Sequence, residues 1–447
     1  MKIRLFGAIA ALAIAVSAPM AQTQNIVEIA VGNEDFTTLV SLVQAAGLVD
    51  ALAGEGPFTV FAPTNDAFAK LPQVAVDFLL ANPDVLTQVL TYHVVPGKVM
   101  SSDLAEGEVT TLQGQTVDVS LSMGAKINDA MVVTADIEAS NGVIHVIDTV
   151  ILPAFDLPEV DPLAVSDNII AAGSSTVFPL TERMADLFKQ DGFGGTITVD
   201  SIGTGAGFER FCVNAETDIS NASRPIRASE VDACRANGIE PVGFFVAIDA
   251  LAIAVSRENT FVDNLTKEQL ADIFSGKAAK WSDVNPSWPA ENIRLFSPGS
   301  DSGTYDYFVE AIFNRDAAPI QNAPGIQFSE DDNVLVAGVE GSPFAIGYFG
   351  YAYYQADIDR MRAIPINGVE PNEQTGASGE YPLARPLLIY TAPSILAAKP
   401  QVAAFVNYYL TNANEQLGAD PNQIGYIPTN KYVQRLNTVL FLASTSE

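Results

Sequence analysis

Residues 168–180 of the chain read NIIAAGSSTVFPL. Residues 169–172 are apolar and read as a buried β-strand, and the apolar residues after Phe178 recur at the spacing of an amphipathic helix. Between them lie Gly173 and three hydroxyl residues at 174–176. The first turn of a helix leaves backbone N–H groups without intrahelical partners, and the helix dipole places partial positive charge there. The stretch therefore predicts a strand-to-helix loop that can hold an anion.

Two more loops of this kind follow. Residues 203–207 read GTGAG after a strand pattern, and residues 297–304 read SPGSDSGT after another. Glycine lets the backbone approach a ligand closely, and small hydroxyls add donors. One such loop is more often an ordinary helix cap, but three in one domain can converge on a small tetrahedral anion. No Gly-Lys-Ser/Thr motif occurs, which argues against a nucleotide P-loop.

An arginine adds a cation to this set. Residues 217–226, TDISNASRPI, read as a short strand that runs into a turn at Arg224. A guanidinium suits bidentate contact with an oxyanion. The alternative is a surface arginine that pairs with one of the many acidic side chains.

Strands alternate with helices from about residue 167 onward, which is an α/β pattern. The four segments above resemble the periplasmic phosphate-binding protein of high-affinity phosphate ABC transporters, over almost all of residues 166–447. The resemblance implies a two-lobed α/β periplasmic-binding-protein fold (type II-like) in residues 167–447. Lobe I would comprise about 167–246 plus 388–447 and lobe II about 247–387, with strand crossings near Phe245–Leu251 and Arg385–Ile389. The phosphate-binding residues expected from the loops and the resemblance are Ser174, Ser175, Thr176, Thr204, Gly205, Ser223, Arg224, Ser300, Asp301, Ser302, Gly303 and Thr304.

The sequence departs from the family pattern at two positions. Ser223 stands where many members have an aspartate that accepts a hydrogen bond from protonated phosphate, and Pro298 stands where many have an arginine. We hypothesise that Arg224 replaces the missing cation and that Asp301 replaces the missing acceptor. Phosphate rather than sulfate is therefore expected mainly from the resemblance.

A separate unit precedes the α/β region. The blocks PFTVFAPTNDAF (57–68), TYHVVPG (91–97) and GVIHVIDTVILP (142–153) resemble the fasciclin domain. The resemblance implies an α+β module over residues 25–155, often used in adhesion, and the acidic, proline-containing residues 156–166 read as a linker. His93 and His145 are interpreted as structural histidines rather than as metal ligands or catalytic groups.

The composition narrows the chemistry. The 447 residues contain 23 Lys+Arg against 53 Asp+Glu, so the formal net charge is −30, and nucleic acid and anionic lipid are poor partners. Because both histidines precede Asp148, a Ser-His-Asp triad or a His-ligated zinc site is not available to the C-terminal two-thirds. No cofactor or metal is expected.

The N-terminus predicts export. Lys2 and Arg4 precede an apolar run over residues 5–16 and a small-residue zone, which indicates a signal peptide over residues 1–21. We expect a periplasmic protein, with the extracellular space as the alternative. In either compartment Cys212 and Cys234, the two cysteines of the chain, favour a disulfide over two buried thiols.

These observations predict an exported, non-enzymatic protein that captures inorganic phosphate and delivers it to an ABC permease in the inner membrane. The fasciclin module would tether it to envelope polysaccharide or to another protein. The alternatives are an adhesion or matrix protein whose α/β domain is a scaffold or binds another oxyanion, and a phosphatase.

Overall fold

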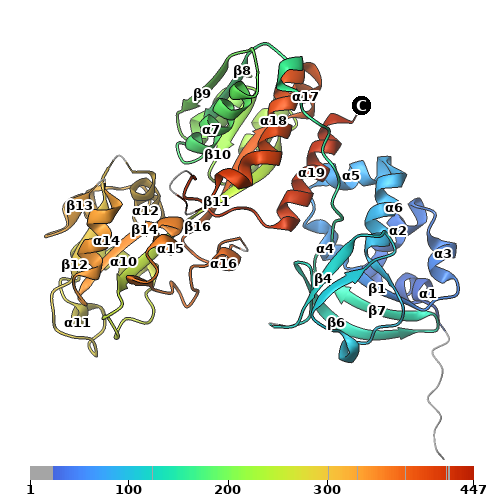
Figure 1. Ribbon diagram of the computed structural model, residues 1–447, viewed down its shortest axis with the longest axis horizontal. Helices are drawn as coiled ribbons and strands as arrows, with labels where there is room; N and C mark the ends of the chain where they lie inside the picture. The colour runs from blue at the N-terminus through green and yellow to red at the C-terminus, as the bar shows by residue number, and fades with distance from the viewer. Residues whose placement is uncertain are drawn as a thin grey trace, which may run out of the picture. The chain divides into compact units, whose positions relative to one another are not determined.

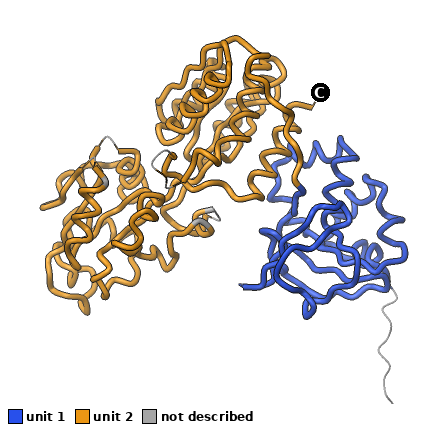
Figure 2. Tube along the Cα trace, in the orientation of Figure 1, with its two compact units in different colours: residues 1–153 blue, residues 154–447 orange. Residues whose placement is uncertain are grey.

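The structure is a computed structural model that describes residues 24–122, 124–300, 302–329, 331–377, 379–418, 420 and 423–446. The chain forms two compact units, and the boundary between them in the sequence falls between Pro153 and Ala154 (Figure 2). The predicted signal peptide lies outside the described residues. Within them, no helix is both long enough and apolar enough to cross a membrane.

The first unit is built on a sheet in the order β2-β1-β7-β6-β5-β4-β3 (Figure 1). Strands β1 (Phe58–Pro63) and β7 (Gly142–Ile147) pair in parallel and are buried almost throughout, and each has a neighbouring strand on both sides. All the other strand pairs of this sheet are antiparallel. The remaining strands are β2 (Val94–Pro96), β3 (Gly107–Thr110), β4 (Thr116–Ser120), β5 (Lys126–Ile127) and β6 (Ala130–Ala139).

Short amphipathic helices complete the first unit. Helix α2 (Thr37–Ala45) buries Leu39, Leu42 and Val43 on one face, and α4 begins with the Thr64 hydroxyl accepting a hydrogen bond from the Ala67 N–H. The helices, apart from the short 3-10 turns, are α1 (Ile26–Val31), α2, α3 (Val49–Ala53), α4 (Asn65–Ala69), α5 (Gln73–Ala81) and α6 (Pro83–Tyr92). The mixture of separate helices and a mainly antiparallel sheet confirms the predicted α+β class.

The second unit has two lobes that share one long strand. The first part of β11 (Val242–Ser256) pairs with β16 (Ala384–Thr391), and from Leu251 onward β11 pairs with β14 instead. In Figure 1, β11 and β16 run between two groups of elements, which we call lobe I and lobe II. The sheet order β13-β12-β14-β11-β16-β10-β8-β9 therefore crosses both lobes. This topology confirms the predicted two-lobed α/β fold.

Lobe I contains parallel strands flanked by helices from both ends of the unit. Its elements besides the shared strands are β8 (Ile169–Gly173), α7 (Phe178–Gln190), β9 (Ile197–Ser201), α8 (Thr204–Phe208), a π-helical turn (Glu209–Val213), β10 (Ile219–Ala222), α9 (Ala228–Ala236), α17 (Pro393–Ala398), α18 (Pro400–Asn412) and α19 (Lys431–Thr445).

Lobe II is inserted in the chain between β11 and β16. Its apolar core gathers around Trp281, Phe308 and Tyr348, with the last two rings stacked 3.9 Å apart. Its elements are α10 (Lys267–Phe274), α11 (Trp281–Val284), β12 (Arg294–Pro298), α12 (Gly303–Phe313), α13 (Ala318–Gln321), β13 (Gln327–Ser329), α14 (Asp332–Glu340), β14 (Ala345–Gly350), α15 (Tyr351–Ala356), β15 (Met361–Ala363) and α16 (Glu373–Ala377).

The segment that opens the second unit packs onto lobe I. Residues 154–161 form neither helix nor strand, and a 3-10 turn follows at Pro162–Ala164. The Asn407 side chain on α18 donates a hydrogen bond to the Pro158 carbonyl at 2.9 Å, and Pro162 is buried. This part of the predicted linker is therefore attached to α18.

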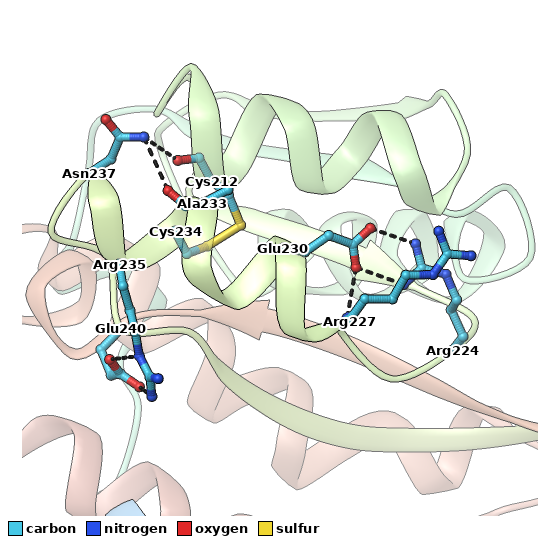
Figure 3. Close-up of a disulfide and its surroundings, with 9 residues drawn as sticks. All are labelled: Cys212, Arg224, Arg227, Glu230, Ala233, Cys234, Arg235, Asn237 and Glu240. Atoms are coloured by element: carbon cyan, nitrogen blue, oxygen red, sulfur yellow. Dashed lines mark hydrogen bonds and ion pairs between the residues drawn. A yellow bond between two sulfur atoms is a disulfide. The ribbon is translucent and has the colours of Figure 1, made fainter.

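The predicted disulfide is confirmed. Cys212 lies in the π-helical turn and Cys234 on α9, and both side chains are buried in an apolar cluster of lobe I. Figure 3 shows the bond, with the Asn237 side chain donating to the Cys212 and Ala233 carbonyls at 2.9 and 3.2 Å. The bridge fixes α9 to the segment that follows the second glycine-rich loop.

Candidate functional site

A cleft of about 560 Å³ lies in the second unit. One wall comes from the loops of lobe I, the opposite wall from helix α12 of lobe II, and Arg385 of the shared strand β16 also lines it. Of the residues predicted from the sequence, the cleft is lined by Ser174, Ser175, Thr176, Thr204, Gly205, Ser223 and Arg224.

The first loop is fixed to its neighbours by backbone contacts. Gly173 has a φ of +141°, and a Cβ there would lie 2.2 Å from the Asn221 carbonyl oxygen, so the position requires glycine. The Ser174 N–H donates to that same carbonyl at 2.9 Å. The Gly173 carbonyl in turn accepts hydrogen bonds from Ile202 and Gly203 at 2.9 and 2.7 Å. The strand end at 173 thus joins the first loop to the second.

The second loop is joined to the Arg224 turn. The Thr204 hydroxyl accepts a hydrogen bond from the Ser223 N–H at 3.2 Å and lies 3.2 Å from the Ser223 hydroxyl. Gly207 packs α8 directly onto β8, because a Cβ there would lie 2.6 Å from the Gly173 Cα. Three segments that are distant in sequence therefore present hydroxyl groups to one cleft.

The third loop does not line the cleft, although the residue that follows it, Tyr305, does. Ser300, Ser302, Gly303 and Thr304 are not among the residues that line the cleft, and Asp301 lies outside the described residues. The Ser302 hydroxyl caps α12 by accepting from the Thr304 N–H at 3.2 Å. Lobe II contributes instead the next turns of α12, which include Tyr305, Asp306 and Glu310.

Arg224 lines the cleft but shares its charge. Its two terminal nitrogens donate to the two Glu230 carboxylate oxygens at 2.8 and 2.7 Å, as Figure 3 shows for the same cluster. Partial burial acts to raise the pKa of Glu230, but the hydrogen bonds from Arg224 and from the Arg227 N–H, together with the charges of both arginines, lower the pKa below its usual value. Both sequence interpretations of Arg224, a cleft cation and a partner for an acidic side chain, therefore describe its position.

Arg385 is a functional candidate that the sequence prediction missed. Its side chain is only 10% exposed and forms ion pairs with Asp249 at 2.9 Å and with Glu310 at 3.2 Å. It donates to the Thr176 hydroxyl at 2.8 Å and lies 3.8 Å over the Tyr307 ring. Each of the two predicted crossing strands carries one charged residue in an apolar run, Asp249 in one and Arg385 in the other. These opposite charges could have indicated that the two residues pair and belong to the site.

The two histidines make contacts within the first unit. His93 is buried, its Nδ1 lies 2.8 Å from the Val89 carbonyl, and its Nε2 accepts from the Ile151 N–H at 3.1 Å. Burial lowers the pKa of His93 from 6.5 to about 4. His145 Nε2 lies 2.9 Å from the Val99 carbonyl. Among the described residues, no group of three or more His, Cys, Asp or Glu side chains could hold a metal ion.

Comparison with known proteins agrees with the division of the chain into two units. The fasciclin domain family matches residues 34–153, and the PBP superfamily domain matches residues 161–413. Protein SphX of Synechococcus elongatus is 43% identical over 270 residues, which are 58% of this chain and 77% of SphX. Phosphate-binding protein PstS of Staphylococcus saprophyticus is 37% identical over 271 residues, 59% of this chain and 81% of PstS.

A solved structure extends the comparison. The crystal structure of a possible phosphate binding protein from Planctomyces limnophilus is 37% identical, with a TM-score of 0.57, and the match covers 63% of this chain and all of that one. The shared strand, the two lobes and the polar cleft define a two-lobed binding protein. The chain belongs to the PBP superfamily, in the family of the phosphate-binding proteins, and carries a fasciclin domain before the binding domain.

Proposed function

We propose that this chain captures inorganic phosphate in the cleft and delivers it to an ABC permease in the inner membrane. The observation that carries the proposal is the convergence of two hydroxyl-rich strand ends, around Thr176 and Thr204, on one cleft that also holds Arg385. Hydroxyl and amide donors act at contact distance, whereas the field of the acidic chain is screened within about 10 Å. The similarity to proteins named as phosphate-binding supports phosphate as the anion.

The proposed ligand contacts come from both lobes. Lobe I contributes the predicted residues that already line the cleft. In lobe II, the third loop leads into α12, whose first two residues are Gly303 and Thr304, so rotation of that lobe toward lobe I would carry the start of α12 toward the anion. The predicted contacts in this loop are Ser300, Asp301, Ser302, Gly303 and Thr304.

Calorimetry on the mature chain tests the binding step. We expect phosphate to bind more tightly than sulfate, and Thr204→Val to weaken phosphate binding by more than about tenfold, about 1.4 kcal/mol. Thr217→Val is the matched control, because Thr217 is buried in lobe I and does not line the cleft. Tighter sulfate binding would contradict the proposed ligand, and absence of anion binding would favour the adhesion alternative. Turnover of a phosphomonoester would favour a phosphatase.

We further propose that the protein acts in the periplasm and that its fasciclin domain tethers it to envelope polysaccharide or protein. The match to the fasciclin domain supports this role. Cell fractionation tests the location. Co-sedimentation with isolated envelope material, comparing the whole chain with a chain that begins at Ala154, tests the tether; equal retention of the two chains would contradict it.

A further inference from the structure

The Glu310 carboxylate occupies a place between two arginines in the cleft. Its Oε1 accepts from Arg315 Nη2 at 2.5 Å and from Arg315 Nε at 3.2 Å, while its Oε2 accepts from Arg385 Nη1 at 3.2 Å. All three residues line the cleft. A carboxylate held between two guanidinium groups has the geometry in which these groups bind an oxyanion ligand.

This carboxylate lies next to the proposed phosphate site. The Arg385 guanidinium that binds Glu310 also donates to the Thr176 hydroxyl at 2.8 Å, and Thr176 belongs to the first anion loop. An anion in contact with Thr176 is therefore within reach of Arg385. Such an anion must either share the Arg385 guanidinium with Glu310 or displace Glu310 from it.

The two carboxylates on Arg385 differ in how firmly they are held. Asp249 is buried, with a side chain 8% exposed, and faces Arg385 in the β11–β16 register. Glu310 is 39% exposed and stands on α12 of the other lobe. Asp306, one turn earlier, places a second carboxylate on the same wall, and like charges four residues apart repel each other. Glu310 is thus the displaceable partner.

We propose that Glu310 is an internal counter-anion. In the ligand-free protein it pairs with the guanidinium groups of Arg315 and Arg385, and bound phosphate takes its place on these donors. This inference rests on phosphate binding in the cleft. Phosphate near neutral pH carries up to two negative charges against one on the carboxylate, so it competes successfully, but the competition weakens its affinity. Glu310 therefore sets the affinity rather than providing a ligand contact.

Calorimetry with inorganic phosphate and sulfate on the whole mature chain tests this role. Glu310→Gln keeps the side-chain shape and removes the charge, and we expect it to tighten phosphate binding at least threefold and sulfate binding in parallel. The matched control is Glu340→Gln, which breaks a comparably exposed pair with Arg360 outside the cleft and should leave both affinities unchanged. Arg315→Gln should weaken phosphate binding at least threefold; its side chain is 67% exposed, so the variant should fold.

The outcomes separate the inference from the proposed function. Wild-type protein that binds no phosphate would overturn both. If wild-type protein binds phosphate, unchanged or weaker binding by Glu310→Gln would overturn the counter-anion role alone. A selective loss of phosphate with sulfate unaffected would make Glu310 an acceptor for the phosphate proton, which also contradicts the inference. Unchanged binding by Arg315→Gln would remove Arg315 from the site.

Discussion

Asp249 and Arg385 face each other across the β11–β16 ladder and form its second-to-last residue pair. Two residues after Asp249, at Leu251, β11 changes its partner from β16 to β14. The pair therefore lies where lobe I passes into lobe II. Burial raises the pKa of Asp249, and the adjacent guanidinium opposes that effect and favours the ionised form. Thr176 from lobe I and Glu310 from lobe II bind the same arginine. One guanidinium thus contacts both lobes and the strands that join them.

Removing the charge of Asp249 should destabilise the second unit. Asp249→Asn leaves Arg385 buried with less compensation, and breaking a buried pair in this way costs about 3 kcal/mol. Denaturant unfolding followed by the fluorescence of Trp281 and Trp288, the two tryptophans of the chain, measures the change. The control is Asp272→Asn, which breaks an exposed pair with Lys277 and should cost at most about 1 kcal/mol. Equal effects would contradict the importance of burial.

The close approach of α8 to β8 should not tolerate a methyl group. Gly207→Ala would place Cβ 2.6 Å from the Gly173 Cα and 3.0 Å from the Ala172 carbonyl oxygen. We expect a loss of stability of about 1–3 kcal/mol and weaker phosphate binding, since the second loop must shift. Gly194→Ala is the control, because its Cβ meets open space. Calorimetry and denaturation check both variants, and a neutral Gly207→Ala would contradict the packing.

Arg224→Ala should weaken phosphate binding by more than about tenfold, which corresponds to about 1.4 kcal/mol. The side chain lines the cleft, and its loss also removes the bidentate partner of Glu230. Arg235→Ala is a matched control, because Arg235 also forms a bidentate pair, with Glu240 (Figure 3). The Arg235 side chain is largely exposed and does not line the cleft. An unchanged dissociation constant would remove Arg224 from the site.

The disulfide should stabilise the second unit mainly by restricting the unfolded chain. Its cysteines are 22 residues apart, and closing such a loop is worth about 3 kcal/mol. Replacing both Cys212 and Cys234 by alanine should lower the free energy of unfolding by this amount, as measured by denaturant titration. Two reactive thiols in the unreduced, denatured protein would show instead that the bond does not form.

The buried His93 should make the first unit less stable in acid. Its pKa in the folded chain, about 4, lies below the ordinary value of 6.5, so the unfolded chain binds a proton first as the pH falls. The stability from neutral His93 is complete above pH 6.5 and is lost between pH 6.5 and about 4, a change of about 3 kcal/mol. NMR titration of the imidazole measures the pKa, and His93→Gln identifies the resonance. A midpoint near 6.5 would contradict the prediction.

The parts of the site that depend on local pattern could be predicted from the sequence. Gly173 and Gly203 interrupt strand patterns and are followed by hydroxyl residues, and each has a positive φ in the structure. The cysteine pair required only the expectation of an oxidising compartment. The loops depend on residues within a few positions of one another, and the two cysteines, although 22 residues apart, are the only possible pair in the chain.

The parts that depend on register and lobe geometry could not. Arg385 becomes a site residue because it faces Asp249 in the strand register and meets Glu310 from α12. Neither contact follows from spacing within one segment. The same limit explains the third loop: its hydroxyls have the right composition, yet the position of lobe II decides which part of α12 lines the cleft.

The connectivity of the second unit has a mechanical consequence. The chain enters lobe I before β8, leaves it through β11, and returns through β16 to finish in α17, α18 and α19. Everything upstream of β8, including the fasciclin domain, is therefore covalently joined to lobe I alone. The proposed rotation of lobe II about the two joining strands therefore changes no covalent link to that module. In the connectivity of the chain, the fasciclin domain is an extension of lobe I, and the strands that would bend during closure do not lead to it.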